Sequence, residues 1–234
     1  YSAGCGAQST YHAVLNHRQF IDAFFRAGWQ NAGGRFSGVT RLDRQGLREL
    51  LTHQPGTEPW FTWQSPRSLA DIVTDINKFS NNVMTRQLVL QMASASEAIR
   101  PDQAAGLQAV RAWLTLQGVL PPGLVMENGS GLSRNTRASA AGLSNLLVHI
   151  ARSDQADVLR ESLPVVGRDG TMKWRLNKHP VAGRAWIKTG SLDQVRAIAG
   201  YVRARSGRLL AVTMIANGRD ARRTTAIQDK LLAW

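Results

Sequence analysis

The sequence is poor in cysteine, and this shortage excludes two kinds of site. Cys5 is the single cysteine among 234 residues. A disulfide within the chain is therefore impossible, and a cysteine-rich zinc site is excluded as well. The five histidines do not compensate, because His12 and His17, five residues apart, would not share one face of a helix. We therefore expect no metal site.

Long apolar runs are also missing. No stretch approaches the roughly 20 apolar residues that a membrane-spanning helix needs. Hydrophobic residues nevertheless make up 43% of the chain, which indicates a folded core rather than a disordered chain. The sequence opens on Tyr1 with small and polar residues and shows no signal-peptide pattern. We expect a mature or trimmed globular chain without a transmembrane segment.

Acidic residues are scarce: 16 aspartates and glutamates stand against 29 lysines and arginines, for a formal charge of +13. A basic surface attracts anions, which could be nucleic acid, anionic polymers of a cell envelope or acidic substrates. Only Arg222 and Arg223 are adjacent, and no lysine-rich run or interleaved aromatic series marks a nucleic-acid groove. We therefore expect a generally basic surface and no nucleic-acid partner.

Hydrophobic periodicity predicts helices in the first two thirds of the chain. A helix is expected over 10–30, and Ser65-Pro66 has the pattern of a second helix start, a serine cap followed by proline. Leu69 and Ile76 then fall on one face, and "KFSNN" (78–82) ends this helix. Further helices are expected over about 83–93, from Pro101 to Gly118, and after a cap at Ser139.

Strand patterns follow in the last third. Residues 196–217 read as two strands joined by a turn at Ser206-Gly207. The last residues, 220–234, are expected to form a helix. Its inward-facing residues would be Ile227, Leu231 and Trp234. Helices followed by antiparallel strands and a closing helix predict helices packed on an antiparallel sheet, an α/β protein of the α+β type.

The first candidate site follows the apolar strand residues 185–187. Lys188, Thr189, Gly190 and Ser191 stand in succession there. A lysine at a strand edge places a positive charge beside a cleft, and Gly190 allows a substrate backbone to approach closely. The hydroxyl groups of Thr189 and Ser191 can donate to a carboxylate, and a backbone N–H of the strand can stabilise an oxyanion. Alone, the stretch is more typical of an ordinary strand end.

A second candidate lies in the loop "ENGSGLSRNTR" (127–137), where Ser133 and Asn135 have S-x-N spacing. Side chains at i and i+2 of an extended segment point the same way, so this hydroxyl and amide would project together into one cleft. The alternative is a glycine–serine turn that is held by its own hydrogen bonds. With the K-T-G triplet about 55 residues later, the pair matches the motifs of penicillin-binding proteins and serine β-lactamases.

The chain resembles the class C low-molecular-mass penicillin-binding proteins, which are periplasmic D-alanyl-D-alanine carboxypeptidases/endopeptidases. The stretches that carry the resemblance are "FIDAFFRAGWQNAGGRFSGVTR" (20–41), "SPRSLADIVTDINKFSNNVMTRQLVLQMA" (65–93), "ENGSGLSR" (127–134), "LPVVGRDGTMKWR" (163–175), "IKTGSL" (187–192) and "AIAGYV" (197–202). It implies the penicillin-binding protein/serine β-lactamase fold, an antiparallel sheet flanked by helices, without its N-terminal portion. Residues 1–62 would end the inserted region of that family, and 63–234 would form the C-terminal part of its catalytic domain.

The nucleophile of that family is missing from the sequence. Its serine belongs to an S-x-x-K motif, in which the lysine lies one helical turn after the serine and activates the hydroxyl. The lysines are Lys78, Lys173, Lys178, Lys188 and Lys230, and the residues three places before them are Asp75, Gly170, Arg175, Ala185 and Ile227. None of these is serine. The chain is therefore either a fragment or a protein that has lost its nucleophile, and the intact second and third motifs favour a fragment.

The resemblance implies a reaction and a role for each residue. A serine from the N-terminal part of the same enzyme would attack the carbonyl between two terminal D-alanines of a peptidoglycan stem peptide, and water would hydrolyse the acyl-enzyme. Ser133 would pass a proton to the leaving amine, Asn135 would hold the substrate amide, and Lys188 would polarise Ser133. Thr189 and Ser191 would bind the terminal carboxylate, and the N–H of Ser191 would form half of the oxyanion hole.

The resemblance also implies the setting. β-Lactam antibiotics would acylate the same serine, no metal or organic cofactor would take part, and the protein would act in the periplasm, within the bacterial cell envelope. The isolated chain would be inactive without the nucleophile. The alternative is a non-catalytic envelope protein that binds peptidoglycan or its anionic polymers through a degenerate site.

Overall fold

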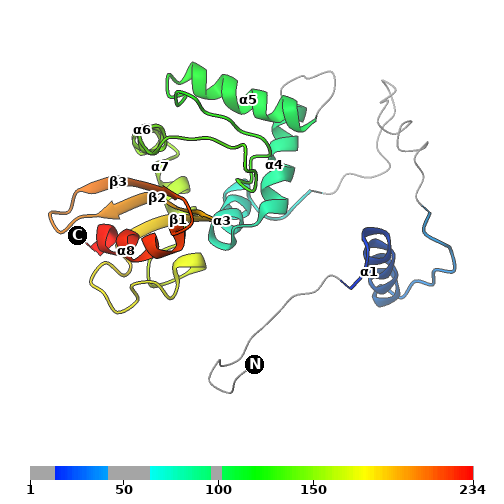
Figure 1. Cartoon of the computed structure of the whole chain (residues 1–234). Helices are drawn as coiled ribbons and strands as arrows, with labels where there is room; N and C mark the ends of the chain where they lie inside the picture. Colours follow the sequence, from blue (N-terminus) through cyan, green and yellow to red (C-terminus); the bar gives the residue numbers. More distant parts are fainter. Residues whose placement is uncertain (1–13, 42–63, 96–101, 234) are drawn as a thin grey trace. The chain divides into compact units, whose positions relative to one another are not determined.

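The computed structural model describes residues 14–41, 64–95 and 102–233. It divides the chain into two compact units, 1–64 and 65–234 (Figure 1). The predicted assignment of 1–62 to an inserted region and of 63–234 to a catalytic domain stays a prediction. In the first unit, helix α1 (His17–Asn31) begins at a capping box made by Asn16 and Gln19. The helix predicted over 10–30 is confirmed from residue 17 onward, while residues 14–16 precede the helix and 10–13 lie outside the described residues.

Helices α3 (Leu69–Phe79) and α4 (Asn82–Ala95) open the second unit. Ser68 caps α3, because its hydroxyl accepts from the Asp71 N–H while the Asp71 carboxylate accepts from the Ser68 N–H. The predicted start at Ser65-Pro66 is therefore wrong by three residues, since this reciprocal cap outcompetes the serine–proline pattern. The predicted break at 78–82 is confirmed, because the two helices are separated there.

Helix α5 (Gln103–Leu116) packs closely against α4 at a glycine. A side chain at Gly106 would overlap the carbonyl of Val89, so the two helices can approach only because this position has no Cβ. Asp102 caps α5 through the N–H of Ala105. Gly118, with a φ of 67°, follows the helix end and confirms the predicted stop.

The three strands form an antiparallel sheet in the order β1 (Ala185–Leu192), β2 (Val195–Arg203), β3 (Leu209–Asn217). Lys188 lies opposite Ala199 in this register. Gly207 adopts a φ of 85° in the turn between β2 and β3, which confirms the predicted Ser206-Gly207 turn. Within the described part of the chain, β1 and β3 are the two edges of the sheet.

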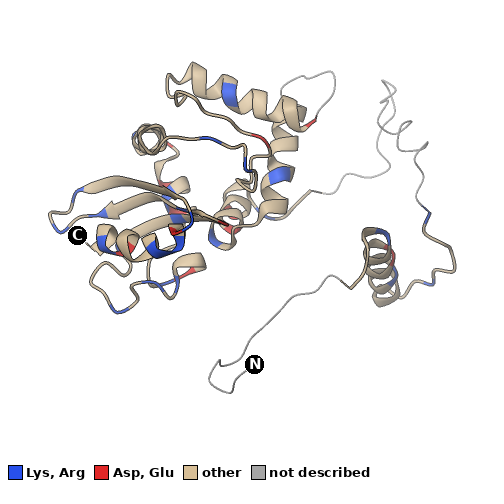
Figure 2. Ribbon diagram, in the orientation of Figure 1, with Lys and Arg blue, Asp and Glu red and all other residues tan. Residues whose placement is uncertain are grey.

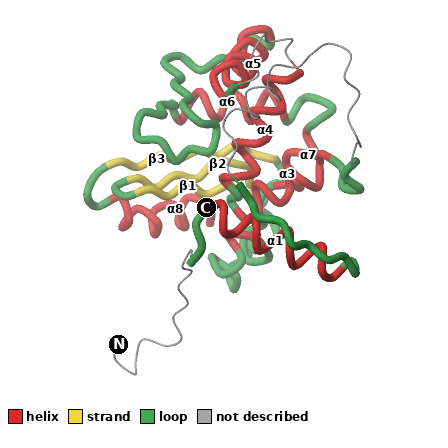
Figure 3. The backbone as a smooth tube through the Cα atoms, turned by 90° about the vertical axis from the view of Figure 1, so that its right-hand side faces the viewer, coloured by secondary structure: helices red, strands yellow, loops and turns green. Residues whose placement is uncertain are grey.

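Two helices cover opposite faces of the sheet (Figures 1 and 3). On one face lies α6 (Ala140–Ile150), capped by Ser139 as predicted, and the Tyr201 hydroxyl donates to the Leu147 carbonyl at 2.7 Å. On the other face lies α8 (Thr225–Ala233). The core beneath α8 contains Val166, Met172, Val181, Ala185, Ile187, Ile198, Val202 and Leu232. This layered arrangement confirms the predicted α+β class.

The predicted inward face of the last helix is wrong. Ile227 and Leu231 are 56% and 41% exposed, whereas Gln228 and Leu232 are each 2% exposed. A short 3₁₀ turn, η3 (Ala221–Thr224), precedes α8 and sets a different rotational phase from that of one continuous helix. Trp234 lies outside the described residues. Among the described helices, none combines the length and the apolar character that crossing a membrane requires.

Candidate active site

The K-T-G stretch faces an open cleft of about 720 Å³ in the second unit. Lys188, Thr189 and Ser191 on β1 form one wall, as the strand pattern predicted. The junction between α3 and α4 forms another wall, and the loop 129–132 forms a third. In Figure 1, α3 and the lower end of α4 lie beside the end of β1. The cleft therefore joins elements that are far apart in the sequence.

Lys188 is the charged group of this cleft. Its side-chain amine donates to the hydroxyl oxygen of Ser80 and, at 3.0 Å, to the carbonyl oxygen of Thr189. The side chain is half-buried, and burial lowers the pKa of Lys188 below its ordinary value. A cation that is partly removed from water gives up its proton to a neighbouring oxygen more readily than an exposed lysine does.

The backbone of Ser80 is unusual. Its φ of 52° and ψ of 47° place it in the left-handed region, which serine rarely adopts. The Ser80 N–H donates to the carbonyl of Ile76 and so ends α3. This conformation turns the chain sharply between two helices and leaves the hydroxyl within reach of Lys188. Left-handed conformations of residues other than glycine cluster at functional sites.

Asn81 fixes the residues on either side of it. Its side-chain oxygen accepts from the N–H of Met84 at 3.1 Å, and its carbonyl accepts from the hydroxyl of Thr85 at 2.9 Å. These bonds cap the start of α4. Asn82, the first residue of α4, is half-buried and lines the cleft. The structure shows no hydrogen bond from the Asn82 side-chain amide to any described residue, so the amide is available to a ligand.

Thr171 extends the hydroxyl-bearing wall beyond β1. It lies in the short 3₁₀ turn η2 (Gly170–Met172), and its hydroxyl is 3.0 Å from that of Thr189. An ion pair of 2.6 Å between Lys78 and Asp169 fastens the neighbouring chain to α3. Asp169 also accepts from the N–H of Val165 at 2.7 Å. Thr171 is therefore held against the cleft by contacts that originate on α3.

Ser133 and Asn135 are placed differently from these residues. The Ser133 hydroxyl donates to the carboxylate of Glu127, and the Asn135 amide donates to the same carboxylate at 2.7 Å. The hydrogen bonds from Asn135 and Ser133 lower the pKa of Glu127. The two side chains point the same way, as their spacing predicted, but they point toward Glu127. The structure does not bring them together with Lys188.

The sequence contains a second S-x-N pattern, within the stretch 78–82 that is predicted to end a helix. Ser80, Asn81 and Asn82 form it within "KFSNN", 108 residues before Lys188. The sequence feature that could have identified this pair is its position between two predicted helices. The end of one helix and the start of the next can direct both side chains into one cleft. In the loop 127–137, no neighbouring helix fixes the direction of Ser133 and Asn135.

The described residues contain no group of three or more histidine, cysteine, aspartate or glutamate side chains that could hold a metal ion. Glu127, six residues before Ser133, has both carboxylate oxygens engaged by Ser133 and Asn135. The lining of the cleft offers a ligand hydroxyl groups, the side-chain amides of Asn77 and Asn82, and the amine of Lys188.

The chain belongs to the D-Ala-D-Ala carboxypeptidase 3 (S13) family, whose model matches residues 3–234. This confirms the predicted family resemblance. The match rests on nearly the whole sequence and so does not depend on which S-x-N pair is chosen.

Individual relatives agree with the family. The chain is 32% identical over 182 residues to the D-alanyl-D-alanine carboxypeptidase of Actinomadura sp. (strain R39), covering 72% of this chain and 34% of that protein. It is 36% identical over 163 residues to the carboxypeptidase DacB of Mycolicibacterium smegmatis, covering 66% and 34%. The chain thus spans about a third of the length of the curated relatives that it matches.

A solved structure supports the fold. Penicillin-binding protein 4 (dacB) from Haemophilus influenzae, complexed with a β-lactam, matches with a TM-score of 0.70 over 95% of this chain and 53% of that chain. The identity is 22%, so the likeness concerns the fold alone. It confirms the predicted penicillin-binding protein type of fold.

Proposed function

We propose that the chain is the C-terminal part of a serine-type D-alanyl-D-alanine carboxypeptidase/endopeptidase that acts on peptidoglycan stem peptides in the bacterial periplasm. One observation supports this proposal beyond membership of the family. The amine of Lys188 donates to the hydroxyl of Ser80 across a cleft that Asn82 and Thr189 also line. Such a lysine–serine pair beside an amide and hydroxyl groups suits acyl transfer from a peptide.

In this proposal Ser80 and Asn82 take the roles predicted for Ser133 and Asn135. The lowered pKa of Lys188 favours transfer of its proton to Ser80, and Ser80 passes a proton to the leaving amine. Asn82 holds the amide of the substrate. The terminal carboxylate binds to the hydroxyl groups of Thr189 and Ser191, with Gly190 allowing its close approach.

The nucleophile comes from a segment that this sequence does not contain. None of the five lysines follows a serine by three residues, so the chain cannot supply an S-x-x-K pair. The open cleft beside Lys188 leaves space for side chains from another segment. We therefore propose that the isolated chain forms no acyl-enzyme and that a β-lactam acylates a serine in the N-terminal part of the same enzyme.

Labelling with a fluorescent penicillin tests this function. The isolated chain should give no labelled band, and addition of the polypeptide that precedes it in the same enzyme should restore labelling. A labelled band from the chain alone would overturn the split site. If the completed enzyme gives no label but still binds purified peptidoglycan, with Lys188→Ala leaving that binding unchanged, the non-catalytic alternative would be preferred.

A further inference from the structure

Arginines gather at the end of the sheet that is remote from Ser191. We define the arginine patch as Arg184, Arg203, Arg205 and Arg208. Backbone contacts hold them together: the Arg203 N–H donates to the Arg184 carbonyl at 2.8 Å, and the Ala204 N–H donates to the Arg208 carbonyl at 2.9 Å. The guanidinium of Arg184 also donates to the Ala204 carbonyl at 2.8 Å. Figure 2 shows basic residues in blue around this turn between β2 and β3.

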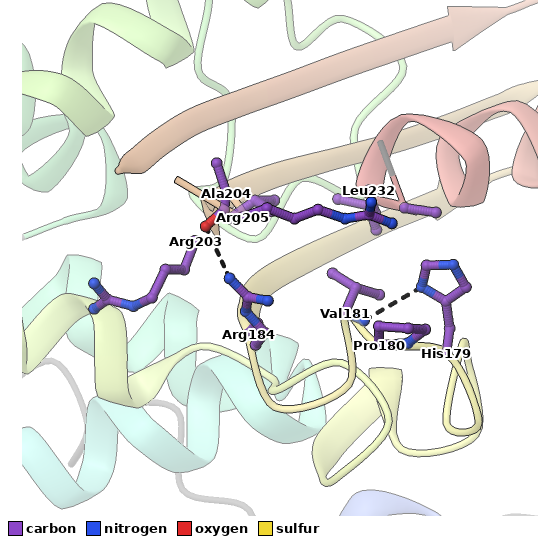
Figure 4. A pocket seen from close by; sticks show the side chains of 10 residues that line it. His179, Pro180, Val181, Arg184, Arg203, Ala204, Arg205 and Leu232 are labelled. Carbon is purple, nitrogen blue, oxygen red and sulfur yellow. Dashed lines mark hydrogen bonds between the residues drawn. The ribbon is translucent and has the colours of Figure 1, made fainter. Parts of the chain in front are cut away.

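The patch has two faces (Figure 4). Arg184, Arg203 and Arg205 line a small hollow together with His179, and the side chain of Arg203 extends to one side of it. Arg203 lies over the ring of Trp186, 6.0 Å from its centroid, and Arg160 lies over the same ring at 5.5 Å. The positive charge is therefore spread along the end of the sheet rather than focused on one point.

The neighbouring Arg160 has a carboxylate partner, Asp157 at 2.8 Å, but the four arginines of the patch have none among the described residues. From Lys173 to Lys230 the acidic residues are Asp193, Asp220 and Asp229. Each is close to a different arginine: Arg134 for the first, Arg223 for the second and Arg175 for the third. No residue of the patch forms an ion pair with any described carboxylate. Crowded like charges without counter-charges favour the approach of an external anion.

We propose that the arginine patch binds a linear polymer with repeated phosphate groups. The guanidinium fork matches phosphate oxygens in pairs, which makes arginine better suited to phosphate than lysine. Because the arginines are spread over two faces, several phosphates along a chain satisfy them better than one isolated phosphate does. Trp186 already has two arginines over its ring, so stacking of nucleobases is disfavoured and the phosphate groups themselves provide the contacts.

Binding at this patch leaves the cleft free. Ala185 and Ser191 stand six residues apart on β1, which corresponds to roughly 20 Å along a strand. An anionic polymer at the patch would therefore hold the protein in place without occupying the cleft. This surface is independent of the proposed peptidase function, because it needs neither the nucleophile nor Lys188.

Binding to inorganic polyphosphate of about 100 units, measured by fluorescence anisotropy at low salt, tests the patch directly on the chain. The test variant is Arg205→Ala/Arg208→Ala, whose side chains are exposed and make no described hydrogen bond. The matched control is Arg219→Ala/Arg222→Ala, which removes the same charge where β3 ends, at the other end of the sheet. We expect about a tenfold weaker binding for the test variant, less than a twofold change for the control, and a shallower salt dependence for the test variant only.

Three results would overturn the inference. Equal losses in the two variants would mean that net charge alone drives binding. Binding of polyphosphate no tighter, per phosphate, than that of inorganic monophosphate would remove the argument for a polymer. Tighter binding of a 20-nucleotide single-stranded DNA than of polyphosphate would assign the patch to nucleic acid. None of these results depends on penicillin labelling, so failure here leaves the proposed peptidase function untouched.

Discussion

Ser80–Asn82 and Ser133–Asn135 have the same S-x-N spacing but different surroundings. In the first pair, the serine ends one helix and the asparagine begins the next, and both face the cleft of Lys188. In the second pair, both side chains donate to the carboxylate of Glu127 and so hold their own loop in shape. The spacing places two side chains on one side in both cases, but only the surrounding elements decide what that side faces.

The two serines also differ in the charged groups and the backbone strain around them. Around Ser80, a half-buried cation with a lowered pKa and an unusual backbone conformation both cost stability. Around Ser133, hydrogen bonds that lower the pKa of Glu127 contribute stability. Strain and a destabilised charge beside a cleft are typical of sites that act on a ligand, whereas a satisfied carboxylate is typical of a structural turn.

The largest expected effect is a difference in acylation rate between variants of the two serines. In the enzyme completed by its preceding segment, Ser80→Ala should slow acylation by fluorescent penicillin by about 10²–10⁴-fold, because it removes the proton relay that we propose. Ser133→Ala should change the rate by less than about threefold, because it only loosens the loop near Glu127. The rate of appearance of the labelled band measures both. A greater loss for Ser133→Ala than for Ser80→Ala would restore the loop serine to the site.

The second prediction concerns the backbone of Ser80. Glycine adopts the left-handed conformation without steric cost, whereas alanine there remains strained. Ser80→Gly should therefore be more stable than Ser80→Ala by about 1 kcal/mol in urea unfolding. Both variants lack the hydroxyl, so their acylation rates should be equally low. At Ser133, whose φ is not positive, the same replacements should reverse the order, with glycine the less stable variant.

A smaller effect is expected at Glu127. Because its folded-state pKa is lowered, its carboxylate stabilises the fold above its unfolded pKa, and this contribution is lost as the pH falls through the folded pKa. Glu127→Gln should lower the melting temperature at pH 7, and the difference from the parent should vanish in acid, well below pH 4.5. Thermal melts followed by circular dichroism measure this. A difference that stays constant between pH 7 and pH 3 would contradict a role for the ionised carboxylate.

Local sequence patterns predicted much of the fold. The Ser139 cap, the Ser206-Gly207 turn and the strand with Lys188 were found correctly, because each depends on residues that are close in the sequence. The choice between Ser80 and Ser133 could not be made in that way, since it depends on a contact between residues 108 apart. The phase of α8 was missed for a similar reason, because a 3₁₀ turn before the helix shifted it.

The smallest expected effect concerns Lys188, whose charged form opposes folding, whereas the charged form of Glu127 favours it. Burial lowers the pKa of Lys188, so the folded state binds its proton less tightly than the unfolded state does, and the charged amine opposes folding at neutral pH. Lys188→Met should therefore melt at a slightly higher temperature than the parent at pH 7. The gap should narrow as the pH rises from the lowered pKa toward the unfolded value near 10.5, where the amine loses its charge in both states. If Lys188→Met instead melts at a lower temperature, the hydrogen bonds of Lys188 to Ser80 and Thr189 stabilise the fold by more than the desolvation of its amine costs. Lys188, to which we assign a chemical role, would then also hold the cleft together.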